Sequence, residues 1–106
     1  MNILTANNKN KEFAKRVATT MGLDQLDFES EYEIEKTGAK NKSPYFPDKG
    51  LKREGKPVIV SDGEYIWILL QSNLDWFKTS PIVSFKKDGN KFLIETENSY
   101  YTLALA

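Results

Sequence analysis

The chain of 106 residues contains no cysteine and no histidine. Without cysteine there is no disulfide, no thiolate nucleophile and no thiolate metal site. Without histidine the chain lacks the one side chain whose ordinary pKa lies near neutrality, and with it most acid–base and zinc chemistry. These absences exclude most of the familiar hydrolase, zinc and redox chemistry. They favour a non-enzymatic protein that works by binding, with no cofactor and no metal.

Long hydrophobic runs are also missing. The longest, residues 65–70, is far below the roughly 18 apolar residues that a membrane span needs. Polar residues 7–11 interrupt the apolar opening before it reaches the length of a signal-peptide core. We therefore expect no membrane crossing and a cytoplasmic location.

One helix is predicted near the N-terminus, over residues 8–21. Phe13, Val17 and Met21 recur every four residues, which is the spacing of one helical face. Gly22 follows the last of them, as expected of a left-handed C-terminal cap.

Residues 28–35 alternate strictly between glutamate and other side chains, which is the period of a half-buried β-strand. The glutamates of this predicted acidic strand are Glu29, Glu31, Glu33 and Glu35. Alternate strand residues lie ~6.6 Å apart, so the four carboxylates would form a regular row on one face.

Glycine and proline recur through residues 36–57, which predicts a long basic loop. From residue 58 onward, short β-favouring runs alternate with turn signals such as Asp62-Gly63 and Asp88-Gly89. This pattern predicts an antiparallel meander over residues 58–106. We expect a single α+β domain, 1–106, in which the N-terminal helix packs on a curved antiparallel sheet or a small SH3-like or OB-like β-barrel of five to six strands.

The 15 basic and 15 acidic residues cancel over the whole chain but are unevenly distributed. Residues 28–35 hold four acidic and no basic groups, whereas residues 36–56 hold seven basic and two acidic groups. A segment of charge −4 is therefore followed directly by one of charge +5, and the two must meet at one edge of the domain.

Both charged segments allow two interpretations. The acidic row can imitate a nucleic-acid backbone and occupy a basic groove, or it can solubilise an exposed face and prevent edge-to-edge sheet pairing. The basic loop combines cations with aromatic rings, as proteins that bind single-stranded nucleic acid do. Alternatively, its aromatic rings fix the loop against the domain, and its lysines are only solvated. The candidate nucleic-acid-binding residues of this loop are Lys40, Lys42, Tyr45, Phe46, Lys49, Lys52 and Arg53.

The large aromatic residues have two expected roles. Trp67 alternates within an apolar strand and is expected in the core. Trp76 and Phe77 follow in a connecting segment, where they can serve as anchors for a partner or as core residues. Glu95 and Glu97 share one strand face, but exposed strand glutamates are far commoner than cation sites, and Ser80 has no imidazole to activate it.

Two local resemblances are present. Residues 3–7, 12–18 and Gly22-Leu23 resemble the first strand, turn and helix of phosphoribosyl pyrophosphate synthetases, and more loosely the start of inosine triphosphate pyrophosphatases. Nothing after Leu23 resembles the later phosphate-binding loops of these families. Residues 78–83 and 94–103 resemble a Thr-Ser-x-Ile … Thr-x-Asn-Ser-x-Tyr ending of small bacteriophage and mobile-element proteins. That resemblance implies a phage-like accessory protein that binds and blocks a host protein.

The leading hypothesis is a small, phage-encoded binding protein that contacts a host macromolecule. In one form it is an inhibitor that presents the acidic strand as a nucleic-acid mimic, with Trp76 and Phe77 as further contacts. The alternative is direct binding of nucleic acid by the basic and aromatic residues of segment 36–56.

Overall fold

A computed structural model describes residues 3–5, 11–40, 50–62, 65–73 and 76–106. Within these residues the chain forms one α-helix, one short 3-10 helix and eight strands. In chain order the elements are β1 (Ile3–Thr5), α1 (Lys11–Met21), η2 (Leu23–Gln25), β2 (Tyr32–Ala39), β3 (Lys52–Asp62), β4 (Tyr65–Gln71), β5 (Trp76–Lys78), β6 (Ile82–Asp88), β7 (Lys91–Thr96) and β8 (Ser99–Leu105).

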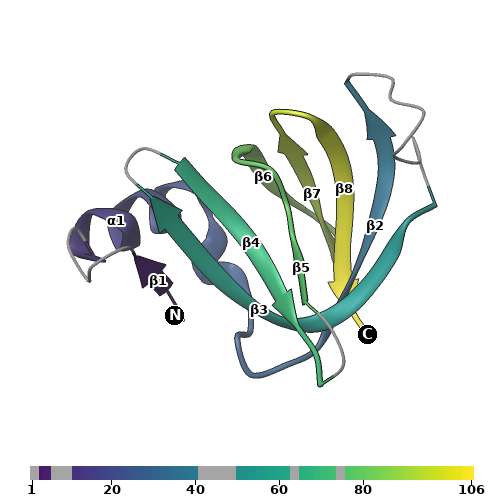
Figure 1. Ribbon diagram of the computed structural model, residues 1–106, viewed down its shortest axis with the longest axis horizontal. Helices are drawn as coiled ribbons and strands as arrows, with labels where there is room; N and C mark the ends of the chain where they lie inside the picture. The colour runs from purple at the N-terminus through teal and green to yellow at the C-terminus, as the bar shows by residue number, and fades with distance from the viewer. Residues whose placement is uncertain (1–2, 6–10, 41–49, 63–64, 74–75) are drawn as a thin grey trace.

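The strands form one curled sheet in the order β5-β4-β3-β2-β8-β7-β6, with antiparallel neighbours along this path. β1 lies beside β3 and runs parallel to it, which the antiparallel prediction did not include. Figure 1 shows the curl, with α1 and β1 on one side and β2, β7 and β8 on the other. The prediction of an α+β fold with a helix on a curved sheet is confirmed. The eight strands exceed the predicted five to six because β1 and β5, with three residues each, are too short to show a period.

The predicted meander over residues 58–106 is interrupted. β3, β4 and β5 follow one another in the sheet, and so do β6, β7 and β8. However, β5 and β6 stand at opposite ends of the strand order, and β2 joins the two groups by pairing with both β3 and β8. Long-range pairing of β2 has no local sequence signal, so a pattern read along the chain misses it.

The predicted loop over residues 36–57 is wrong at both ends, because β2 continues to Ala39 and β3 begins at Lys52. Gly38 and Gly55 mark irregular strand positions rather than turns. The β2–β8 register shifts between Lys36 and Gly38, and Gly55 lies where β3 passes from β2 to β4 as its partner. A Cβ at residue 55 would lie 2.6 Å from the carbonyl oxygen of Gln71, so only glycine fits this close approach.

Helix α1 begins within the predicted range, and residues 8–10 lie outside the described part of the chain. It ends at Met21, and Gly22 follows with a φ of +91°, which is the expected left-handed conformation. Ala14 and Ala18 are fully buried, whereas Phe13 is 49% exposed although the period places it on the apolar stripe. The two small side chains let the helix approach the sheet closely, and this contact moves Phe13 to the edge of the buried face.

The core fills the inner side of the curl. It joins α1 and η2 to the inward residues of the strands, and Phe85 stacks on Phe92 with ring centroids 4.9 Å apart. Its fully buried large side chains include Leu23, Ile34, Ile59, Ile68, Leu70, Ile94 and Leu103. Among the described residues, no helix has the length and apolar character needed to span a membrane.

Candidate functional site

The acidic row predicted over residues 28–35 is only half formed. β2 begins at Tyr32, so Glu33 and Glu35 lie on the strand, where both are partly buried. Glu29 and Glu31 precede it and are exposed. The regular row of four carboxylates is therefore corrected to a pair on the outward side of β2.

A turn built by Asp27 delays the start of β2. Its carboxylate accepts hydrogen bonds from the Ser30 hydroxyl at 2.7 Å and from the Glu29 backbone N–H at 3.1 Å. Such local bonds from aspartate compete with strand pairing. The Ser30 and Glu29 bonds lower the pKa of Asp27, because they stabilise the ionised carboxylate.

Two of the predicted basic residues lie close to carboxylates. Lys40 forms an ion pair with Glu95 at 2.5 Å and lies over the ring of Tyr100. The Nζ atom of Lys52 lies 4.0 Å from Glu35. Lys42, Tyr45, Phe46 and Lys49 fall outside the described residues.

An open groove of about 410 Å³ brings the remaining candidates together. Its lining residues come from β2, from the start of β3, and from the segment that contains β5. They are Glu33, Lys52, Arg53, Glu54, Ser72, Trp76 and Phe77. Five of the seven were predicted as candidates from the two charged segments and the aromatic pair. Sequence reasoning missed Glu54 and Ser72, and it assigned Lys52 and Arg53 to nucleic acid.

The groove lies where the sheet is incomplete. β3 pairs with β2 over its first residues, and with β4 only from Lys56 onward. β5 pairs with β4, and among the described strands it has no neighbour on its other side. The start of β3, which pairs with β2 alone among the described strands, therefore presents a strand edge to the groove, and a strand edge can accept an added strand.

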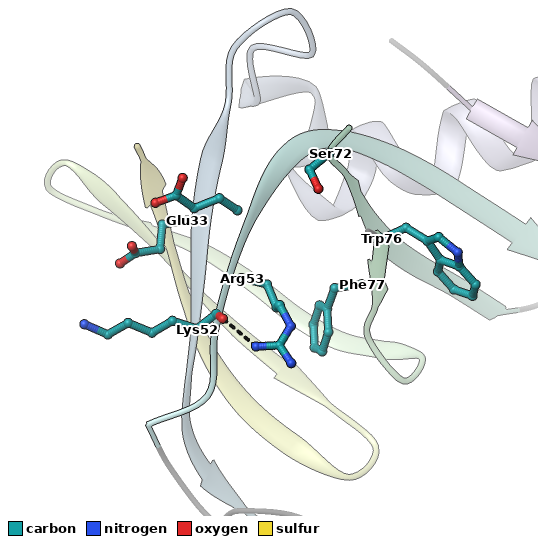
Figure 2. Close-up of a pocket in the computed structure, with 7 residues that line it drawn as sticks. Glu33, Lys52, Arg53, Ser72, Trp76 and Phe77 are labelled. Atoms are coloured by element: carbon teal, nitrogen blue, oxygen red, sulfur yellow. Dashed lines mark hydrogen bonds between the residues drawn. The ribbon is translucent and has the colours of Figure 1, made fainter. Parts of the chain in front are cut away.

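Arg53 and Phe77 form the inner part of the groove. The register pairs Arg53 with buried Ile34 and Phe77 with buried Leu70, so both belong to the inward face. Figure 2 shows the Arg53 side chain extending beside the Phe77 ring, and Arg53 donates a 2.8 Å hydrogen bond to the carbonyl of Lys52. Phe77 also meets Tyr101 edge to face at 5.9 Å.

The charges lining the groove are balanced in number but not in arrangement. Glu33 stands directly opposite Glu54 in the β2–β3 register, on the outward face. Like charges in opposed strand positions destabilise a sheet. A cationic group placed between these two carboxylates would remove that repulsion.

Trp76 lies on the opposite side of β5 from Phe77, as Figure 2 shows. It is 65% exposed, the highest value among the large hydrophobic side chains of the described residues. The interpretation of Trp76 as a core residue is therefore wrong, whereas Phe77 is half-buried and reaches both the core and the groove.

The expectation that Trp67 belongs to the core is also wrong. Ile66, Ile68 and Leu70 take the inward positions of β4 and are buried, so the alternating Trp67 points outward and is half-buried. The apolar run alone could not reveal this, because a strand that is apolar at every position is also typical of one buried on both faces.

Ser80 and Glu95, which were considered as catalytic or cation-binding residues, make contacts that stabilise the fold. The Ser80 hydroxyl donates to Thr96 at 2.6 Å, and Glu95 forms the ion pair with Lys40. β7 ends at Thr96, so Glu97 lies beyond the strand that was expected to hold both glutamates. No cluster of three acidic residues suited to a metal ion occurs among the residues described.

Comparison of the chain with protein-family models, with curated proteins and with solved structures finds no match.

Proposed function

We propose that this protein is a non-enzymatic binding protein that takes a segment of a partner protein into the groove between β3 and β5. The observation that carries the proposal is the groove itself. It combines the strand edge at the start of β3, an exposed tryptophan at its rim and an arginine beside a phenylalanine at its inner part.

The chemistry of the groove favours an extended peptide segment with a basic side chain and an apolar one. The edge of β3 can pair with an extended backbone. The opposed carboxylates of Glu33 and Glu54 suit a lysine or arginine, and Phe77 and Trp76 offer contact to an apolar side chain. Inhibition of a host protein, the role implied by the phage resemblance, is one form of this function.

A nucleic-acid partner has less support from the described residues. Nucleic-acid grooves present mainly cations, because the phosphate backbone dominates affinity. Here Glu33 and Glu54 line the same groove as Lys52 and Arg53, while Lys40 is paired with Glu95.

The substitution Trp76→Ala tests this function. We expect it to remove the proteins that wild-type protein captures from a lysate of the source cells, because an exposed tryptophan is a typical interface anchor. Phe13→Ala is the matched control, since Phe13 is 49% exposed on α1, outside the groove. Captured proteins are compared by quantitative mass spectrometry, and thermal unfolding confirms that both variants fold. Equal capture by wild type and Trp76→Ala would contradict the assignment to this groove.

A further inference from the structure

A buried lysine lies on the inward face of the sheet, on the same side as the inner part of the groove. Lys36 is 7% exposed, and the alternation of buried residues along β2 places it on the inward face with Ile34. Its register partner on β8 is Tyr101, whose ring meets Phe77 edge to face. Lys36 therefore belongs to the same face as Arg53 and Phe77.

A β-bulge holds the backbone of Lys36. Its N–H donates to the carbonyl of Leu51 at 2.8 Å, and its carbonyl accepts from the N–H of Gly50 at 2.9 Å. Two residues just before β3 thus stand opposite one residue of β2, and Gly50 has the positive φ, +89°, of a G1 bulge. With Tyr101 paired on the other side, the inward direction of Lys36 is fixed by both neighbouring segments.

The inward face has cations and no carboxylate at this end of the sheet. The glutamates of the surrounding strands, Glu33, Glu35, Glu54 and Glu95, all take outward register positions. Among the described residues, the lysines that form ion pairs are Lys40 and Lys52. Lys36 and Arg53 therefore have no carboxylate partner in this part of the chain. Burial raises the pKa of Tyr101, so its phenol stays neutral and adds no negative charge.

The two cations have donors available for a ligand. Lys36 makes no side-chain hydrogen bond among the described residues, where Oγ1 of Thr5 is the only enclosed side-chain polar atom that lacks a partner. The Lys36 ammonium is therefore not enclosed, and a ligand can reach it. Arg53 donates to the carbonyl of Lys52, which leaves further N–H groups of its planar guanidinium for an anion. A buried ammonium without an anion lowers the stability of a fold, so a bound anion would offset this cost.

We propose that Lys36 and Arg53 together bind a carboxylate of the partner segment. The inference rests on the proposed function, in which an extended segment pairs with the edge of β3. Side chains of such a segment alternate between the two faces of the sheet, so the neighbour of a basic residue held by Glu33 and Glu54 points inward, toward Arg53.

The dimensions of a sheet suit a carboxylate at this place. Arginine binds a carboxylate through two parallel N–H bonds. An added strand would lie two strand spacings, ~9.6 Å, from β2, and a glutamate side chain and the Lys36 side chain can span this distance together. The partner segment should therefore carry an acidic residue directly beside a basic one.

An array of short peptides with blocked ends tests this expectation, because side chains then supply every carboxylate. We expect the wild-type protein to bind peptides that contain adjacent acidic and basic residues. A second array with free C-termini shows whether the chain end can supply the carboxylate instead. Peptides that bind through Trp76 but carry no carboxylate would overturn this inference and leave the proposed function standing. Absence of any bound peptide in both arrays would contradict the proposed function itself, and this inference with it.

Substitutions of the two cations test their role directly. Lys36→Met and Arg53→Met should each weaken binding of an acidic peptide by about 10-fold or more, measured by fluorescence anisotropy. Neither should change binding of the same peptide with glutamine in place of the acidic residue. Lys56→Met is the matched control, because Lys56 is exposed on β3 and lies outside the groove, and it should bind both peptides as the wild type does. Unchanged binding of the acidic peptide by Lys36→Met and Arg53→Met would overturn the proposal.

Thermal unfolding separates this role of Lys36 from a structural one. Without peptide, Lys36→Met should raise the midpoint of unfolding by about 4 °C or more, because it removes a buried charge that has no carboxylate partner. A midpoint below that of the wild type would show that Lys36 stabilises the fold, and would overturn its assignment to a ligand.

Discussion

Gly55 is the residue that allows β3 to pass close to Gln71 at the end of β4. A Cβ at this position would lie within 2.8 Å of three backbone atoms of Gln71, so neither strand can yield without breaking pairing. We predict that Gly55→Ala lowers the free energy of unfolding by about 2 kcal/mol or more, as expected for overpacking against a rigid neighbour.

Gly38→Ala is the matched control for this prediction. A Cβ there would meet only the Tyr100 ring, at an ordinary contact distance of 3.5 Å. Chemical denaturation of the two variants should therefore give a large loss for residue 55 and a change within about 0.5 kcal/mol for residue 38. Similar losses at both positions would mean that the close approach to Gln71 does not require glycine.

At the scale of elements, sequence reasoning predicted those features that depend on neighbouring residues. The end of α1 at Gly22 and the hairpin around Gly89, whose φ is +62°, follow from local turn chemistry. The extent of β2 and β3 could not be predicted in this way, because their glycines serve a register shift and a close approach between strands. The same limit explains why Glu33 was grouped with Glu29 rather than with Glu54.

The opposed glutamates of β2 and β3 lead to one prediction that concerns both stability and binding. Glu33→Gln should raise the free energy of unfolding of the isolated protein by about 0.2–1 kcal/mol, because it removes the repulsion from Glu54 across the two strands. The same substitution should weaken capture of a basic partner segment.

Glu29→Gln is the control, because Glu29 precedes β2 and is exposed. It should leave both the thermal unfolding and the capture unchanged. A loss of stability in Glu33→Gln would show that the two carboxylates do not repel each other in the folded protein.

Over the whole molecule, the balance of 15 basic and 15 acidic residues predicts weak attraction to nucleic acids. We expect no retardation of a single-stranded oligonucleotide in a gel-shift assay at low salt. Retardation that falls steeply as salt is raised would instead support the alternative binding by segment 36–56.

The pairing of β2 with both β3 and β8 also constrains how the chain folds as it is synthesised. Tyr32 pairs with Leu105, and the backbone N–H of Ala106 donates to the carbonyl of Glu31 at 3.0 Å. β2 therefore lacks one of its two neighbours until residues 99–105 have left the ribosome. During this interval its exposed edge needs protection, so chaperone contact with the nascent chain should concentrate on β2.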